Sequence, residues 1–555
     1  MLRIGALLLL AVLAKSSAPA MVVDLTNEDM ATKIAVQVCA GILNRAGASN
    51  ANTVYTLLTQ PYDSDWLFDA EQVSDPTLTS SDDVLSRCLL DSSIKGYIKY
   101  NYKDQQVVVP NLITLAAVLD AVLLEEGHPA LVGATQVYDA VTEWQGFSGL
   151  DASEYMYTHH VGATSTLAWM NPGYDGFANA THPPLTGDLN PGLIDYIVKE
   201  RIFNFYLNNA CIPTTDDYSF TKRMTSHNPW PRPIPVYGYG DEYPVAGDIF
   251  EAETNCNREH NMGQIASSGT NNLAFLSRKP EITTPLQSNP AELESFNAST
   301  TYISFIMGDG DNVQYLKTSR RDWMMERVSR CDADPSYMGC FPLSWSISPH
   351  PRFFAPDWWY WFFNQSYATK HDYFVLPPSG DLYSYPSEMP ADVQAQYVKD
   401  TERDCELLTT SGSVHWEFLG HWGKAMGEYF PQYSPAGIVK GFFAVNVPYN
   451  VPMVEVFRPG EFYKIVGDNV VVFRPREWRG TEFSRNVPLS RRQFLSVKEQ
   501  TAVLEHLPPG SMTCLYITSD GGGGLDMIYD LVKGLDSRIK VVSHEALIDL
   551  ALQRG

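Results

Sequence analysis

Eight short apolar segments recur in the second half of the chain, and most of them are separated by stretches long enough to hold a helix. Strands that alternate with helices are typical of α/β folds with parallel sheets. Eight such repeats predict a (β/α) barrel or a close relative, with a distorted seven-stranded barrel as the main alternative. An open doubly wound sheet would show the same alternation. The predicted strands are residues 301–308, 340–348, 371–378, 413–420, 440–447, 469–475, 511–518 and 540–544.

The first part of the chain shows the same alternation over a shorter stretch. Residues 52–58 and 96–100 are predicted strands, and residues 24–47 form a predicted helix. A second helix is predicted over 111–127, capped by Asn111 and ending at a glycine. This pattern favours a small α/β module ahead of the C-terminal domain.

The 555 residues exceed what one hydrophobic core usually holds, so we expect a multidomain α/β protein. Few large apolar residues and three prolines mark residues 279–300 as a linker. The predicted organisation is a signal peptide over 1–20, an N-terminal α/β module over 21–150, a proline-rich region over 151–278, the linker over 279–300, and a C-terminal barrel-like catalytic domain over 301–555.

The N-terminus, MLRIGALLLLAVLAKSSAPA, has the positive, apolar and small-residue parts of a cleavable signal peptide. No later apolar run is long enough to span a bilayer, so we expect a secreted or luminal protein. Acceptor sequons predict glycosylation at Asn179, Asn297 and Asn364.

The chain has eight cysteines, and an oxidising compartment would favour disulfides among them. Cys331 and Cys340 flank a short polar loop and are the strongest local candidates for a pair.

The formal net charge of −24 disfavours nucleic acid and anionic membrane surfaces as partners. It is compatible with neutral ligands such as sugars. The sequence does not indicate an oligomeric state.

Polar residues follow the predicted strands, where reacting groups of (β/α) barrels lie. In FIMGDGDNVQY an apolar strand runs directly into Asp309 and Asp311. If this segment is extended, the two carboxylates point the same way and can divide into one acid and one base or nucleophile, as glycoside hydrolysis requires. The alternative is a turn in which the carboxylates cap backbone amides.

Other strand ends supply further candidates. Glu417 and Glu477 are additional catalytic carboxylates, because another strand could provide the partner of an aspartate. The predicted substrate-binding residues are Asn312, His350, Ser379, Gly380, Tyr383, Tyr385, His421, Trp422 and Asp520. Trp345 and Trp478 are further candidates for a sugar-stacking platform.

The histidines allow a metal site to be considered. An aspartate with His350 and His421 could hold a divalent ion, as in hydrolytic deacetylases, but no HExxH or HxxxH motif is present. We therefore predict no metal and no cofactor.

The dense aromatic run at 355–367 is more typical of a helix core. If Asn364 is exposed on this helix, Tyr360 and Trp361 should lie near the surface, and Trp359 and Phe362 should be buried.

The segment SGDLYSYP, residues 379–386, resembles the signature of the GxGYxYP family of glycoside hydrolases, with Leu382 in place of the second glycine. The preceding HDYFVLPP, the DGDN at 309–312, AGILNR at 40–45, DWLF at 65–68 and NNLAFLSRKP at 271–280 are similar to the family as well. The resemblance implies N-terminal α/β modules, a barrel-like C-terminal domain and a hydrolase-type cleft.

The sequence thus predicts a secreted enzyme that cleaves a glycosidic bond in a carbohydrate substrate. A non-catalytic secreted glycan-binding protein is the first alternative, and a metal-dependent hydrolase or carbohydrate deacetylase is the second.

Overall fold

The computed structural model describes residues 18–45, 52–170, 191–207, 209–226, 230–238, 249–267, 269–433, 435–447, 453–479, 495–518 and 524–554. The chain forms two compact units. Unit 1 comprises Met1–Leu207, Ser268–Glu281 and Arg352–Trp358, and unit 2 comprises Asn208–Ser267, Ile282–Pro351 and Trp359–Gly555.

Unit 1 is built from short parallel strands and the helices that pack on them. β1 pairs with β2, β3 lies between β4 and β5, and β6 pairs with β7, all in parallel. The strands are β1 (Met21–Asp24), β2 (Val54–Leu57), β3 (Gly96–Tyr100), β4 (Ala121–Glu125), β5 (Gln136–Asp139), β6 (Leu167–Trp169) and β7 (Phe203–Phe205). The helices are α1 (Met30–Arg45), α2 (Tyr62–Glu71), α3 (Ser81–Leu90), α4 (Tyr102–Gln105), α5 (Val109–Leu119), α6 (Ala140–Glu143), α7 (Gly149–His160), α8 (Ile194–Glu200), α11 (Leu273–Leu276) and α14 (Pro351–Phe354).

The helix predicted over 111–127 is wrong in its second half. Helix α5 ends at Leu119, Asp120 adopts a left-handed conformation with φ of 51°, and Ala121–Glu125 form the buried strand β4. Asn111 lies inside the helix, where its side-chain amide donates to the hydroxyl of Ser153 at 3.2 Å. A continuous apolar run does not distinguish a buried helix from a buried strand, and here pairing with β3 decides the outcome.

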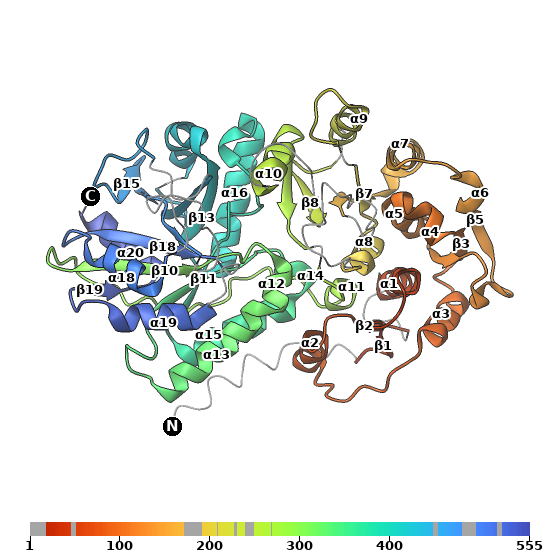
Figure 1. Cartoon of the computed structure of the whole chain (residues 1–555), viewed down its shortest axis with the longest axis horizontal. Coiled ribbons are helices and arrows are strands. Elements are labelled where there is room, and N and C mark those ends of the chain that lie inside the picture. Colours follow the sequence, from red (N-terminus) through yellow and green to blue (C-terminus); the bar gives the residue numbers. More distant parts are fainter. Residues whose placement is uncertain are drawn as a thin grey trace. The chain divides into compact units, whose positions relative to one another are not determined.

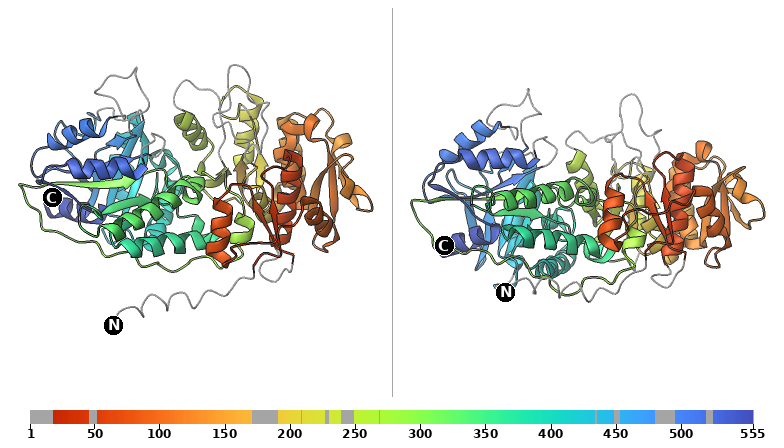
Figure 2. Two further views of the ribbon diagram at one scale, coloured as in Figure 1. Left: turned by 60° about the horizontal axis from the view of Figure 1, so that its bottom comes forward. Right: turned by 90° about the horizontal axis from the view of Figure 1, so that it is seen from below.

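Unit 2 contains two larger groups of strands. The first has the order β12-β11-β10-β18-β17 with β19 also paired to β10, and all these pairs are parallel. The second has the order β13-β14-β16-β15, with only β15 antiparallel. In Figures 1 and 2 the green strand β10 lies beside the blue strand β18, so the first and last long strands of the unit are neighbours.

Strands and helices alternate along most of unit 2. The strands are β8 (Ile234–Gly238), β9 (Met262–Ile265), β10 (Thr301–Met307), β11 (Leu343–Ser346), β12 (Asp372–Val375), β13 (Gly412–Phe418), β14 (Gly441–Val447), β15 (Tyr463–Val466), β16 (Val470–Phe473), β17 (Glu477–Trp478), β18 (Met512–Ile517) and β19 (Ile539–Val541). The helices are α9 (Asp216–Thr225), α10 (Ile249–Glu259), α12 (Val313–Lys317), α13 (Ser319–Ala333), α15 (Pro356–Thr369), α16 (Ala391–Leu408), α17 (Trp422–Lys424), α18 (Val497–Glu505), α19 (Gly524–Gly534) and α20 (His544–Arg554).

The mixed α/β class and the parallel sheets predicted from the sequence are confirmed, and each of the eight predicted segments overlaps a strand. A parallel bridge between Leu376 and Ser413 connects the end of β12 to β13. One buried cluster contains Ile306 of β10, Val414 of β13 and Leu547 of α20, so both groups of strands share a core. Within the described residues no ladder joins β16 to β17, and the closed barrel stays a prediction.

Three cysteine pairs lie at disulfide-bonding distance: Cys39–Cys88 in unit 1, and Cys211–Cys256 and Cys331–Cys340 in unit 2. The last is the pair favoured by the sequence. These disulfides are compatible with secretion. In the described part of the chain, no helix combines the length and the apolar character that crossing a membrane requires.

Two of the three predicted glycosylation sites lie on the surface. Asn297 and Asn364 are exposed, whereas Asn179 and residues 1–17 of the predicted signal peptide lie outside the described residues. On α15, Trp359 and Phe362 are buried while Tyr360 and Trp361 are partly exposed, as the helical periodicity predicted.

Candidate active site

A cavity of about 100 Å³ lies in unit 2, where the carboxyl ends of several parallel strands meet. Acidic, amide and aromatic side chains line it together. The lining residues are Gln264, Ala266, Asp309, Asp311, Asn312, Tyr315, Pro378, Tyr383, Trp416, Val445, Glu477, Arg479, Tyr516 and Thr518. It therefore contains the carboxylates and the aromatic faces that a sugar-cleaving site needs.

The loop after β10 is fixed tightly against β11. The amide of Gly310 donates to the Ser346 hydroxyl at 3.0 Å, and the amide of Ser348 donates to the Gly310 carbonyl at 2.8 Å. A Cβ at position 310 would lie 1.8 Å from the Ser346 carbonyl oxygen, so only glycine allows this approach. The fixed position of Gly310 thus also fixes the backbone of its neighbours Asp309 and Asp311.

Asp309 adopts a left-handed conformation with φ of 58°, so the aspartates lie in a turn and not in an extended segment. The amide of Asp309 donates to the Tyr516 hydroxyl at 2.9 Å, and its carboxylate lies 3.6 Å from the guanidinium of Arg320, which is 1% exposed. Arg320 also donates to the carbonyl of Gly308. The turn therefore holds one carboxylate against a buried cation.

Asp311 has a different electrostatic environment. Burial, together with the negative charge of Asp309, raises the pKa of Asp311 to about 7. At neutral pH this carboxyl group is therefore protonated in a large fraction of molecules and can donate a proton. Asn312, the next residue, accepts a hydrogen bond from the Gln314 amide at 3.0 Å and begins α12.

Glu477 of β17 brings a third carboxylate to the cavity. It is 5% exposed, and its Oε1 accepts a hydrogen bond from Nε of Arg479 at 2.9 Å. The neighbouring Trp478 is fully buried, and its indole N–H donates to the Leu495 carbonyl at 2.8 Å. Because side chains alternate along a strand, Glu477 faces the cavity while Trp478 does not.

Aromatic side chains form another part of the wall. The rings of Tyr383 and Trp416 lie 5.6 Å apart at an angle of 35°. Tyr383 exchanges two backbone hydrogen bonds of 3.0 Å with Gln264, which places the side chain of Gln264 at the cavity as well. Tyr385 is 1% exposed and stacks on the Trp416 indole with centroids 6.4 Å apart.

Part of the chain is similar to a known protein family. The family model described as "GxGYxYP putative glycoside hydrolase C-terminal domain" matches residues 299–435. Residues 299–435 are therefore similar to the C-terminal domain of the GxGYxYP family. The resemblance found in the sequence is thereby confirmed over this range, which includes the aspartate turn and the GxGYxYP segment itself.

The fold is also similar to that of a crystal structure described as "a putative hydrolase" from Bacteroides thetaiotaomicron VPI-5482. The TM-score is 0.71 at 18% identity, and the alignment covers 97% of this chain and 96% of that one. At such an identity the likeness concerns the fold alone. None of the curated proteins matches the chain.

The GxGYxYP segment is held by its own backbone and by helix α16. The Ser379 hydroxyl lies 2.9 Å from the Ser384 carbonyl and accepts from the Trp416 amide at 2.8 Å. The Tyr397 hydroxyl accepts from the Leu382 amide at 3.0 Å. Gly380 has φ of 102°, a value that L-residues rarely adopt. Ser379 and Gly380 therefore shape the segment and do not line the cavity.

Leu382, where the chain departs from the family signature, is buried against β9. A Cβ at Gly263 would lie 2.6 Å from the side chain of Leu382, so the missing side chain at 263 makes room for the leucine. Leu382 is not among the described residues with positive φ. The extra side chain is thus accommodated by packing, and the backbone keeps an ordinary conformation.

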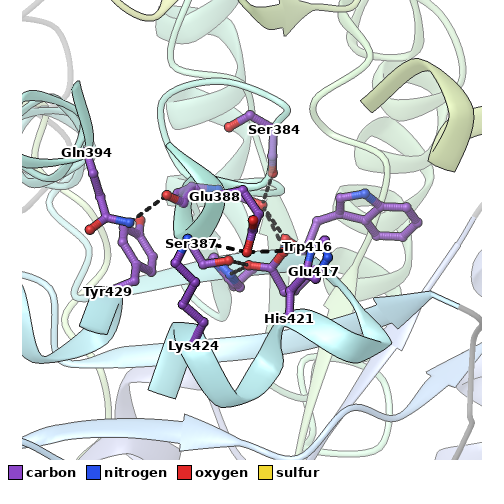
Figure 3. Close-up of polar contacts among 12 residues, drawn as sticks. Ser384, Ser387, Glu388, Gln394, Trp416, Glu417, His421, Lys424 and Tyr429 are labelled. Carbon is purple, nitrogen blue, oxygen red and sulfur yellow. Dashed lines mark hydrogen bonds and ion pairs between the residues drawn. The ribbon is translucent and has the colours of Figure 1, made fainter. Parts of the chain in front are cut away.

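Glu417 lies on the opposite face of β13 from Trp416. Its carboxylate accepts from the Ser387 hydroxyl at 2.5 Å and lies 3.3 Å from Nε2 of His415 and 3.6 Å from Nδ1 of His421. Figure 3 shows Ser387, His421 and Glu417 gathered together, with the indole of Trp416 directed away from them. Burial alone would raise the pKa of Glu417, but hydrogen bonds from the two histidines and Ser387 hold it below its usual range.

The cavity thus unites five of the predicted site residues: Asp309, Asp311, Asn312, Tyr383 and Glu477. The other predicted residues inside the described chain are not part of its lining, and most of them are buried: His350, Ser379, Gly380, Tyr385, Glu417, His421 and Trp422. Trp345 is buried as well, with its indole N–H donating to Asp372. Asp520 lies outside the described residues.

Sequence reasoning missed several lining residues, among them Gln264, Trp416, Arg479 and Tyr516. Trp416 and Tyr516 could have been found from strand alternation, because each lies on the inward face of a strand that had been predicted. No pattern near Gln264 predicts that it lines the cavity, because it lies there through a β-bridge to Tyr383, more than a hundred residues away. The described residues contain no cluster of three or more metal-ligating side chains.

Proposed function

We propose that unit 2 is a glycoside hydrolase whose cleavage site is the cavity at the strands' carboxyl ends. The observation that carries the proposal is the pairing of Asp311, with a pKa of about 7, and Asp309 in one aromatic-walled cavity. Glycoside hydrolysis needs one carboxyl group that donates a proton and one carboxylate that acts as base or nucleophile.

In this mechanism Asp311 protonates the oxygen of the leaving sugar. Its partner carboxylate is Asp309, held by Arg320, or Glu477, held by Arg479; either would activate water or attack the sugar. Tyr383 and Trp416 would bind the apolar face of a sugar ring, and Asn312 and Gln264 would hydrogen-bond its hydroxyl groups.

The wider setting of the proposal is a secreted protein with a carbohydrate substrate, in which the strands of unit 2 form a barrel-like catalytic domain. The acidic net charge and the three cysteine pairs are compatible with this setting. The domain boundaries, the signal peptide and the three glycosylation sites remain predictions of the sequence.

The test is hydrolysis of a panel of polysaccharides and oligosaccharides, measured as newly formed reducing ends. We expect Asp311→Asn to lower the rate about a thousandfold, because general acid catalysis contributes on that order. The matched control is Asp392→Asn, since Asp392 is an exposed aspartate on α16, and it should behave as wild type. The wild-type rate should fall as the pH rises through 7, when Asp311 loses its proton.

Other outcomes would decide between the alternatives. Wild-type rates for both Asp309→Asn and Asp311→Asn on every cleaved substrate would overturn the proposed roles. Binding of a polysaccharide without cleavage of any would favour the glycan-binding alternative. Release of acetate that stops after exhaustive chelation would favour the deacetylase.

A further inference from the structure

We propose that unit 2 has a second carbohydrate-binding site, located beside the amino ends of β11 and β12, at the opposite edge of the sheet from the active cavity. Two adjoining cavities of about 190 and 380 Å³ lie there. They share Tyr337, Lys540 and Val541 as common walls. The inference takes only the class of ligand from the proposed function, and the site itself is argued from its own residues.

Two residues that line the smaller cavity each carry a buried polar atom that makes no hydrogen bond within the described chain. Tyr373 is 2% exposed, and its hydroxyl makes no hydrogen bond to any described residue. Nδ1 of His371 is likewise buried without a partner there. The two residues are two apart at the start of β12, so they face the same side. Because a buried polar group without a partner destabilises the fold, a ligand whose hydroxyl groups satisfy both would be bound favourably.

The charges in this cavity suit a neutral ligand rich in hydroxyl groups. Glu292 and Glu294 line it, and the carboxylate of Glu294 is paired with the ammonium of Lys540 at 2.5 Å. Carboxylates accept hydrogen bonds from sugar hydroxyls. Burial and the charge of Glu292 raise the pKa of Tyr373 to about 12, so its phenol keeps its proton and remains a donor.

Tyr337 supplies an aromatic surface between the two cavities. Its hydroxyl accepts from the Val541 amide at 2.7 Å, which fixes the outer end of the ring, yet the residue is 42% exposed. The loop that carries it is closed by the Cys331–Cys340 disulfide. An aromatic ring that is held at both its backbone and its hydroxyl, in a residue that remains exposed, is suited to the C–H face of a pyranose.

The two cavities together favour a chain of sugars over a single one. The smaller cavity offers the hydrogen-bonding groups, whereas the larger cavity, lined by Met338, Leu535 and Ser537 among others, continues on the other side of Tyr337. A polymer could therefore be held here while another part of it, or another molecule, occupies the active cavity.

The experiment measures retardation of the protein in native gels that contain starch, xylan, laminarin, galactomannan or dextran. All variants are made in the inactive Asp311→Asn background, in a bacterial host that does not glycosylate Asn297. We expect at least one polymer to retard the parent. Tyr337→Ala and the isosteric Tyr373→Phe should each weaken that affinity about tenfold or more. Tyr367→Phe, which removes the hydroxyl of an exposed tyrosine on α15, is the matched control and should change nothing.

The outcomes separate this proposal from the proposed function. Unchanged retardation in both Tyr337→Ala and Tyr373→Phe, or a parent that no polymer retards, would overturn the second site. Retardation that is lost in Trp416→Ala but kept in Tyr337→Ala would overturn it as well, because the polymer would then occupy the active cavity. If the Tyr337 effect is present and the wild type hydrolyses nothing, the second site stands and the hydrolase proposal fails.

Discussion

Asp311 and Glu417 are carboxyl groups near the carboxyl ends of two strands in the same unit, yet their surroundings are opposite. Asp311 follows β10 in a turn that borders the cavity, and the carboxylate nearby is that of Asp309. Glu417 belongs to β13 itself and is enclosed by His415, His421 and Ser387. The negative charge of Asp309 disfavours ionisation of Asp311, whereas hydrogen-bond donors stabilise the ionised form of Glu417.

This difference shows that carboxyl groups near the strand ends of one parallel sheet can have different roles, in the cavity or in the packed interior. Loops that follow the strands open into the cavity, whereas within a strand the side chains alternate, so Trp416 faces the cavity and Glu417 faces the packed helices behind it. Residue type and position near a strand end are therefore insufficient to identify a catalytic carboxylate. The face on which the side chain lies decides its role.

The largest expected effect is on catalytic rate. Asp311→Asn should lower kcat about a thousandfold on any oligosaccharide that the wild type cleaves, because it removes the proton donor. Glu417→Gln should keep kcat within about tenfold, since Glu417 does not reach the substrate. Initial rates at saturating substrate check both. A thousandfold loss in Glu417→Gln with an unchanged fold would contradict the comparison.

The second expected effect is on stability, and here Glu417→Gln should be the more damaging variant. Glu417→Gln removes the negative charge and puts an amide NH₂ donor where Ser387, His415 and His421 meet a carboxylate oxygen, so it should lower the free energy of unfolding by about 3 kcal/mol. Asp311→Asn should not lower it, because it removes a carboxyl group that burial disfavours in its charged form. Urea unfolding at pH 7, followed by tryptophan fluorescence, measures both. Equal losses in the two variants would mean that the two environments do not differ as described.

A third prediction concerns the sign of the pH dependence. The raised pKa of Asp311 means that the folded state holds its proton longer than the unfolded state, so this group costs stability increasingly as the pH rises from about 4 to about 7. Asp311→Asn should therefore become more stable than wild type above pH 7. The gain should be only about 1–2 kcal/mol, because Asp311 is partly exposed and solvent screens its charge.

Glu417 should show the opposite sign. Its pKa is lowered in the folded state, so its contribution is present above the ordinary glutamate pKa and is lost as the pH falls through the folded value. The stability difference between wild type and Glu417→Gln should accordingly shrink in acid. Parallel pH trends for the two variants, followed by urea unfolding across this range, would contradict the assignment of their surroundings.

The sequence predicted much of this fold because apolar segments of strand length carry their own signal. All eight strands predicted after residue 300 exist, and Asp309, Asp311 and Asn312 are predicted site residues that line the cavity, although they lie in a turn and not in the extended segment that the sequence analysis favoured. The failures have two physical origins. The apolar run that became α5 and β4 has no local feature strong enough to reveal the break at Asp120.

The other failure lies in the site, where pairing across long sequence distances decides which residues meet. Gln264 reaches the cavity only because β9 bridges to Tyr383, and no pattern near residue 264 indicates it. His421 and Trp422 are predicted from their residue type, but neither lines the cavity: His421 lies beside Glu417, and Trp422 is fully buried. The sequence therefore indicated which strand ends border the cavity, but not which side chains at those ends face it.

The smallest expected effect tests those faces with a matched pair of tryptophans. Trp416 lines the cavity beside Tyr383, while Trp422 is fully buried and meets the His415 ring edge-on at 5.5 Å. Trp416→Phe should raise KM about fivefold to tenfold with little change in kcat, because it weakens a stacking surface worth about 1 kcal/mol and leaves the carboxyl groups in place. Trp422→Phe should leave KM unchanged and lower only the unfolding free energy. If instead Trp422→Phe raises KM and Trp416→Phe does not, the cavity wall has been assigned to the wrong face of β13, and Glu417 rather than Asp311 would become the carboxylate to examine.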